Sequence, residues 1–186
     1  MRRIKLRIAP PTEPVPPGRG FYQLEEEALH IPIGVPPPDR RFFSWLESDL
    51  VQMDIDRTGK LLFVAVNCPR RQWSWLEGLA APQAAAMADV RWVNFRTRMA
   101  EPRLLTDRRR SLVKVVWLDE IAARTYYLAD HVLLQTDADL HPTAIWVTDI
   151  SDDLAGREIM ECRKEWRRQR HRVGAFRQPV IPSWSA

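Results

Sequence analysis

Alternation of apolar and polar residues predicts β-strands along much of this chain. Residues 4–8 alternate apolar and basic side chains, which is the period of a half-buried strand. Residues 21–24 and 28–33 predict one hairpin, and residues 103–106 and 112–118 predict another. Together with further alternation over residues 91–97, this pattern predicts an α+β fold with a mostly antiparallel sheet.

Two segments separated by 81 residues share one order of features. Residues 51–55 alternate and end in the polar turn that begins at Asp56, and an apolar run follows at residues 61–66. Residues 132–136 lead in the same way to Asp137, a short polar turn and a second apolar run. We interpret the shared order as an internal duplication of a strand–turn–strand unit. The alternative is chance recurrence of a common pattern.

The end of the chain has a different periodicity. Ser151, Asp152 and Asp153 are candidate N-cap residues, and the sequence from there to about Val173 is compatible with a long basic helix. Shorter helices are expected over residues 83–89 and 119–124. The predicted organisation is an N-terminal strand and Pro-rich arm (1–20), a first strand-rich unit (21–82), a second unit (83–150), a C-terminal helix (151–174) and an extended tail (175–186).

The composition limits the class of protein. The 186 residues suffice to bury a core, and 45% hydrophobic with 28% charged residues is ordinary globular usage, whereas 15 prolines and 8 tryptophans are not. Two distant cysteines predict no disulfide framework. The sequence has no apolar core of a signal peptide and no apolar run of the ~20 residues that cross a bilayer. We therefore expect a soluble cytoplasmic protein without a membrane partner.

The strand–turn–strand unit resembles a family of short bacterial proteins known as domain of unknown function 2283. The resemblance rests on residues 22–31, which include Ala28-Leu29-His30-Ile31, and on residues 56–61 with Val64-Ala65-Val66. In the later copy only residues 137–150 are similar, and His141-Pro142 replaces the glycine. Neither copy has the Gly-Ile-Glu that members usually carry. The resemblance implies a small β-rich fold and no catalytic residues.

No group of residues predicts catalysis, a metal site or a cofactor. Asp54, Asp56, Asp137 and Asp139 could suggest a cation site, but aspartates at these positions are typical of turns. The four histidines lack the usual ligand spacings, and both cysteines are expected in the core. An enzyme is therefore the less favoured hypothesis. It would gain support from a cavity that holds His30 or His131 beside Asp56 or Asp137.

Basic clusters give one functional hypothesis, because arginines can follow the phosphates of a nucleic acid. One cluster is the presumed hairpin tip Arg108-Arg109-Arg110, and the other lies on the predicted C-terminal helix. The residues proposed to bind nucleic acid are Arg108, Arg109, Arg110, Arg163, Lys164, Arg167, Arg168, Arg170 and Arg172. The alternative is a solvated or protein-facing helix whose Glu161 and Glu165 pair with Lys164 and Arg168.

The tryptophans give a second hypothesis, because eight are many for a core of this size. Trp73, Trp75 and Trp184 are the ones expected to be exposed, and exposed aromatics beside arginines are enriched at protein interfaces. The alternative is that tryptophans cover the open ends of the sheets. The sequence therefore favours a non-enzymatic interaction module with a protein partner, or a small subunit of an oligomer or larger assembly. Nucleic-acid binding is the alternative.

Overall fold

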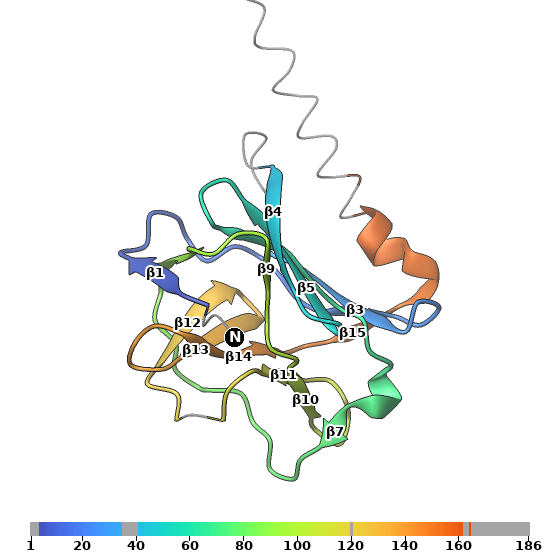
Figure 1. The fold of residues 1–186 in the computed structure, drawn as a ribbon. Coiled ribbons are helices and arrows are strands. Elements are labelled where there is room, and N and C mark those ends of the chain that lie inside the picture. The colour runs from blue at the N-terminus through green and yellow to red at the C-terminus, as the bar shows by residue number, and fades with distance from the viewer. Residues whose placement is uncertain (1–3, 35–40, 120, 162–163, 165–186) are drawn as a thin grey trace, which may run out of the picture.

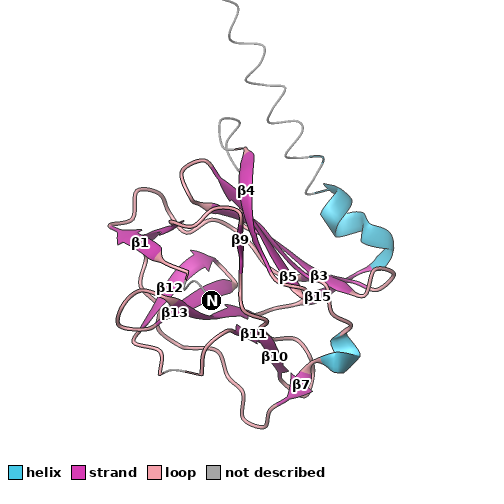
Figure 2. Cartoon of the chain, in the orientation of Figure 1, coloured by secondary structure: helices cyan, strands magenta, loops and turns pink. Residues whose placement is uncertain are grey.

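The computed structural model describes residues 4–34, 41–119, 121–161 and 164, and two large β-sheets form its framework (Figure 1). Helix is scarce in this part of the chain, as Figure 2 shows. It comprises the 3-10 helices η1 (Arg70–Gln72) and η2 (Leu154–Gly156), and helical residues at 157–161 and 164. None of the described helices is long and apolar enough to cross a membrane.

One sheet has seven strands in the order β15-β2-β3-β6-β5-β4-β9. Its strands are β2 (Phe21–Gln23), β3 (Ala28–Pro32), β4 (Phe42–Glu47), β5 (Val51–Asp56), β6 (Leu61–Val66), β9 (Thr97–Arg98) and β15 (Ser151–Asp153). Strands β2 to β6 pair antiparallel, whereas β15 and β9 add to the two edges in parallel.

The other large sheet has six strands in the order β12-β13-β14-β11-β10-β7. Its strands are β7 (Ser74–Trp75), β10 (Arg103–Thr106), β11 (Val113–Val116), β12 (Arg124–Ala129), β13 (Val132–Thr136) and β14 (Pro142–Val147). Strand β7 pairs in parallel with β10. Two further strands, β1 (Leu6–Ala9) and β8 (Asp89–Trp92), form an antiparallel ribbon.

The two large sheets repeat one strand order, and each includes at least one edge strand from the other half of the chain. The order β2-β3-β6-β5-β4 in one sheet corresponds to β10-β11-β14-β13-β12 in the other. Strand β7 follows β6 along the chain, yet it pairs with β10 of the other sheet. Strand β15 follows β14, yet it pairs with β2. Each half of the chain therefore supplies an edge strand to the sheet of the other half.

The turns of the two corresponding hairpins have the same hydrogen bonds. In the β5–β6 turn, Oδ1 of Asp56 accepts the N–H groups of Thr58 at 2.7 Å and Lys60 at 3.0 Å. In the β13–β14 turn, Oδ1 of Asp137 accepts those of Asp139 at 2.9 Å and His141 at 2.8 Å. The fourth residue of each turn has positive φ, +86° at Gly59 and +63° at Leu140. An aspartate at the first position thus closes both turns in the same way.

The buried apolar residues form one cluster between the two sheets. Leu29, Val51 and Val66 enter it from the seven-stranded sheet, and Leu134 and Ile145 enter it from the six-stranded sheet, all fully buried. Each Å² of apolar surface removed from water contributes about 25 cal/mol of stabilisation. One joint core buries more apolar surface than two separate cores and is therefore favoured.

Four expectations about the fold are corrected by the structure. The helix expected over residues 119–124 is not observed in its described residues, because residues 121–123 are not helical and strand β12 begins at Arg124. The sheets are mixed, with parallel pairs at their edges, where a mostly antiparallel sheet was predicted. The predicted long C-terminal helix is not supported, because Ser151–Asp153 form strand β15 and α-helical residues begin only at Arg157. Residues 162–163 and 165–174 of the predicted helix lie outside the described part of the chain. The helix predicted over residues 83–89 is absent, because Ala86 forms a bridge with Tyr126. The predicted tail (175–186) lies outside the described residues.

Candidate partner-binding surface

Trp73 and Trp75 have opposite environments although they are two residues apart. Trp73 is only 3% exposed, donates its Nε1–H to the carbonyl oxygen of Cys68 at 3.2 Å, and packs edge-on against Tyr22. Its predicted exposure is wrong, because the 3-10 helix η1 turns the chain back onto β2 just before it. Trp75 is 60% exposed on the short strand β7, as the sequence predicted.

Strand β7 places Trp75 beside the end of strand β10. Trp75 lies opposite Thr106 in the parallel pair, and the N–H of Leu76 donates to the carbonyl oxygen of Thr106 at 3.0 Å. Leu76 is also exposed. The turn that carries Arg108, Arg109 and Arg110 begins directly after Thr106. Two groups of residues that the sequence nominated separately therefore lie at one edge of the six-stranded sheet.

The arginine turn has a fixed backbone. Oδ1 of Asp107 accepts the N–H groups of Ser111 at 2.9 Å and Leu112 at 3.2 Å, and the N–H of Arg110 donates to the carbonyl oxygen of Asp107 at 3.0 Å. Arg108, Arg109 and Arg110 are exposed, and none forms an ion pair with another described residue. We call Trp75, Leu76 and Arg108–Arg110 the Trp75 edge.

The Trp75 edge has the chemistry of a recognition surface. An exposed tryptophan supplies a large apolar contact area, and arginines supply charge and several hydrogen-bond donors, so both are enriched at the centres of protein interfaces. Strand β7 is also the last strand of its sheet. An edge strand offers backbone N–H and C=O groups to a partner, although this one is only two residues long.

The other residues proposed from the sequence contribute little to this surface. Lys164 is exposed and its Nζ lies 2.6 Å from Oε1 of Glu161, as expected for a pair three residues apart on a helix. The remaining proposed residues lie outside the described part of the chain: Arg163, Arg167, Arg168, Arg170, Arg172 and Trp184.

A second exposed apolar surface lies on β4 and on the loop between β8 and β9. Phe42, Phe43, Val93 and Phe95 are exposed, and the rings of Phe43 and Phe95 meet edge-on with centroids 5.7 Å apart. The guanidinium of Arg57 lies 5.5 Å from the centroid of the Phe43 ring. We call these five residues the Phe43 surface. Sequence reasoning missed β4, and the doublet Phe42-Phe43 after two arginines was the available signal.

Two hydrogen bonds, to Lys5 and to Ser44 of β4, hold the loop that presents Phe95. Oδ1 of Asn94 accepts the N–H of Lys5 at 2.8 Å, and Oγ of the buried Ser44 accepts the N–H of Arg96 at 3.1 Å. Arg96 has a φ of +48°, a region that non-glycine residues adopt at some cost. A fixed aromatic side chain loses little entropy on binding, which favours recognition.

One cluster of potential metal ligands is present among the described residues, formed by Asp137, Asp139 and His141. Its ligand atoms lie within 4.8 Å of one another, but the turn already uses the Asp137 carboxylate. Oδ1 accepts two backbone N–H groups, and Oδ2 lies 2.9 Å from Nδ1 of His141. Burial acts to raise the pKa of Asp137, but the hydrogen bonds and charge of His141 hold that pKa below its usual value. These hydrogen bonds explain the positions of Asp137 and His141 as parts of the turn.

The remaining groups weighed for catalysis have structural partners or surroundings. Nε2 of the buried His30 lies 3.0 Å from Oε2 of Glu26. Nδ1 of His131 lies 3.3 Å from Oγ1 of Thr148. Burial raises the pKa of the Cys68 thiol, which disfavours the thiolate that a nucleophile needs.

Comparison of the sequence with protein-family models and with characterised proteins gave no match. The resemblance to domain of unknown function 2283 stays a prediction. Function is therefore inferred from the geometry of the exposed surfaces.

Proposed function

We propose that this protein is a cytoplasmic, non-enzymatic interaction module, a small subunit of an oligomer or larger assembly, whose main contact is the Trp75 edge. The observation that carries the proposal is the parallel pairing of β7 with β10, which brings the exposed Trp75 beside three arginines that have no acidic partner among the described residues. This charge and apolar area suit a protein partner with acidic side chains.

Two exposed surfaces support a role within an assembly. The Phe43 surface lies on β4 of the seven-stranded sheet and on the loop between β8 and β9, whereas the Trp75 edge belongs to the six-stranded sheet (Figure 1). A subunit that contacts two neighbours needs two such surfaces, and apolar patches on a protein surface commonly mark interaction sites.

We also propose that the scaffold arose by internal duplication, and the distribution of the surfaces is consistent with it. The shared strand order and the matching Asp56 and Asp137 turns are features of both halves. The residues that follow Phe43 and Trp75 by 81 positions are Arg124 and Gly156, so neither aromatic side chain is repeated. The residues proposed for recognition thus lie at positions where the two halves of the chain have different side chains.

Nucleic-acid binding is the second candidate function, and the exposed Arg108–Arg110 turn is the observation that favours it. Three arginines on one turn can neutralise about three phosphates, and each contact would steepen the salt dependence of binding. Trp75 could stack on a base beside them. A protein that uses this mode would shift single-stranded DNA or RNA at low salt and lose the shift as salt rises.

Site-specific crosslinking tests the proposal directly. A photo-reactive benzoylphenylalanine would replace Trp75 in the full chain expressed in cells, and the same group at the exposed Ile121 is the control position. We expect protein adducts from position 75 that Arg109→Glu removes. Arg124→Glu is the matched charge control, because β12 is the opposite edge of the same sheet. Nucleic-acid adducts would favour the second candidate, and equal adducts from positions 75 and 121 would contradict both.

A further inference from the structure

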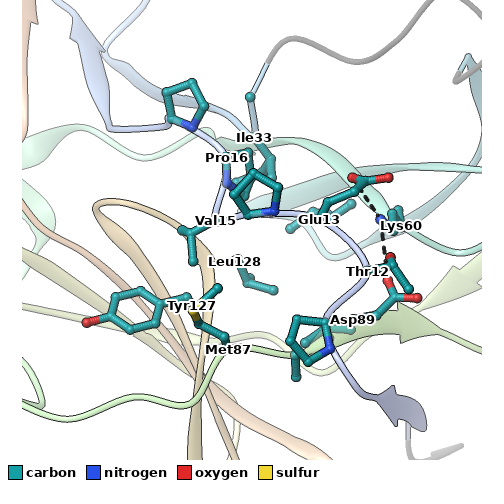
Figure 3. Close-up of a pocket in the computed structure, with 17 residues that line it drawn as sticks. Thr12, Glu13, Val15, Pro16, Ile33, Lys60, Met87, Asp89, Tyr127 and Leu128 are labelled. Carbon is teal, nitrogen blue, oxygen red and sulfur yellow. Dashed lines mark hydrogen bonds and ion pairs between the residues drawn. The ribbon is translucent and has the colours of Figure 1, made fainter.

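A cavity of about 350 Å³ lies where the Pro-rich arm crosses the body of the protein (Figure 3). Residues 11–17 of the arm form one wall. Met87, Val90 and Leu128 from the opposite side, together with Val15 and Ile33, make most of the lining apolar. The cavity is separate from the Trp75 edge, because none of its lining residues belongs to that surface. Its size and lining are typical of small-molecule sites.

One cation faces this apolar space. The side chain of Lys60 is only 15% exposed, and its Nζ lies 3.1 Å from Oε2 of Glu13 and 3.4 Å from Oδ1 of Asp89. Nη2 of Arg91 lies 2.8 Å from Oδ2 of Asp89. The pair of Asp89 and Arg91 is neutral by itself, so the charge of Lys60 is balanced by Glu13. Figure 3 shows Glu13 and Asp89 on the two sides of the Lys60 ammonium group.

Asp89 is a permanent part of this arrangement. Burial acts to raise the pKa of Asp89, but Arg91 and Lys60 hold that pKa below its usual value, so the carboxylate stays charged at neutral pH. Its backbone is also fixed, because it pairs with Ala9 in the β1–β8 ribbon. Glu13 differs in both respects, because it lies on the arm and its side chain is about half exposed.

The arm is fixed at its ends rather than along its length. Strand β1 ends at Ala9, and the carbonyl oxygen of Pro16 accepts the N–H of Asp130 at 3.0 Å. Between these points, residues 10–15 make no backbone hydrogen bond to any described residue. Five prolines in residues 10–17 remove most of the donors and keep the segment extended. The Glu13 contact can therefore open without the loss of a backbone ladder.

We propose that the cavity binds a small carboxylic acid with an apolar body, and that its carboxylate replaces Glu13 on Lys60. The apolar body would lie against Val15, Met87 and Leu128, and the ligand carboxylate would restore the charge balance that Glu13 provides in its absence. Glu13 then competes with the ligand for Lys60, and the arm that carries Glu13 moves away when the ligand binds. No covalent step is involved.

Calorimetric titration of the full chain with octanoate, and with octanol as the uncharged analogue, tests this inference. We expect saturable octanoate binding that is stronger than octanol binding. Glu13→Gln should tighten octanoate binding by about 3- to 10-fold, because the Glu13 carboxylate then no longer competes with octanoate for Lys60. The effect is modest because a partly exposed ion pair contributes little free energy. Lys60→Met should remove the preference for octanoate over octanol. The matched controls Glu77→Gln and Lys5→Met, at exposed positions outside the cavity, should leave both affinities unchanged.

The outcomes are distinct even if one variant is unstable. Lys60→Met is interpreted only if its thermal unfolding remains cooperative, whereas Glu13→Gln changes an exposed side chain and tests the competition alone. The inference is overturned if neither the native chain nor Glu13→Gln binds octanoate up to about 5 mM. It is also overturned if Lys60→Met keeps the preference for octanoate, or if Glu13→Gln binds it no more tightly than Glu77→Gln does.

Discussion

The backbone N–H of His141 donates to Oδ1 of Asp137 at 2.8 Å, and Nδ1 of the same histidine lies 2.9 Å from Oδ2. One carboxylate thus joins both ends of the β13–β14 turn and orients a buried imidazole. Asp56 accepts the N–H of Lys60 in the corresponding turn. The aspartate is therefore a structural requirement of the turn rather than a catalytic group.

Asp137→Ala should lower the free energy of unfolding by about 1–3 kcal/mol at neutral pH, because buried N–H groups lose their acceptor. The folded-state pKa of Asp137 lies below the reference value of 3.8, so its ionised form stabilises the fold. This contribution is complete above about pH 5 and is lost as pH falls through the folded-state pKa. Urea unfolding at neutral and acidic pH measures it. Asp139→Ala is the control, and an equal loss there would contradict the assignment.

Gly59→Ala should destabilise the protein by about 2–4 kcal/mol. A Cβ at this position would lie 2.3 Å from the carbonyl oxygen of Trp92, and its φ of +86° is unfavourable for alanine. Gly78 has a similar φ of +70° but open space around it, so Gly78→Ala should cost only about 1 kcal/mol. Thermal or urea unfolding of both variants separates the steric effect from the backbone effect, and equal losses would refute the close approach to Trp92.

Truncation of Trp73 should destabilise the protein, whereas truncation of the neighbouring Trp75 should affect mainly partner binding. Trp73→Ala removes a buried ring and a hydrogen bond, and we expect a loss of about 3–5 kcal/mol in unfolding free energy. Trp75→Ala should change stability by less than about 0.5 kcal/mol while it weakens partner binding. Urea unfolding gives the first quantity, and crosslinking through a photo-reactive residue placed at the exposed position 77, beside the Trp75 edge, gives the second. A large stability loss in Trp75→Ala would argue that its role is structural.

Cys68 should react slowly with alkylating reagents in the folded protein. The side chain is buried, and burial raises the pKa of its thiol, so little thiolate is present near neutral pH. Mass spectrometry after iodoacetamide treatment, with and without urea, measures the rate at this residue. Equal alkylation rates with and without urea would show that Cys68 is accessible in the folded protein, and Cys68 would then be a candidate nucleophile.

Hairpins were the part of the fold that the sequence predicted well. Residues 51–55 and 132–136 alternate, and an aspartate follows each, so both local signals agree with the observed β5–β6 and β13–β14 turns. The strand exchange was not predictable, because β7 and β15 are two and three residues long and carry no periodic pattern. The polar Ser151–Asp153 segment has the composition of a helix N-cap, and only its distant partner β2 makes it a strand.

The candidate surface was predicted in pieces. Exposure of Trp75 and of Arg108–Arg110 follows from local sequence, and the structure shows it. Their proximity depends on the pairing of Trp75 with Thr106, a parallel contact with no local signature. The burial of Trp73 depends in the same way on Tyr22, more than forty residues earlier in the chain. Contacts between residues far apart in the sequence therefore determine that Trp75 lies near the arginines and that Trp73 is buried.

The exchanged edge strands have a consequence for synthesis on the ribosome. Phe21 emerges early, but its pairing partner Ser151 is translated 130 residues later. The seven-stranded sheet therefore has an incomplete edge until residues 151–153 have left the exit tunnel. An unpaired edge invites association between nascent chains. We expect chaperone dependence during translation to fall sharply once β15 has emerged.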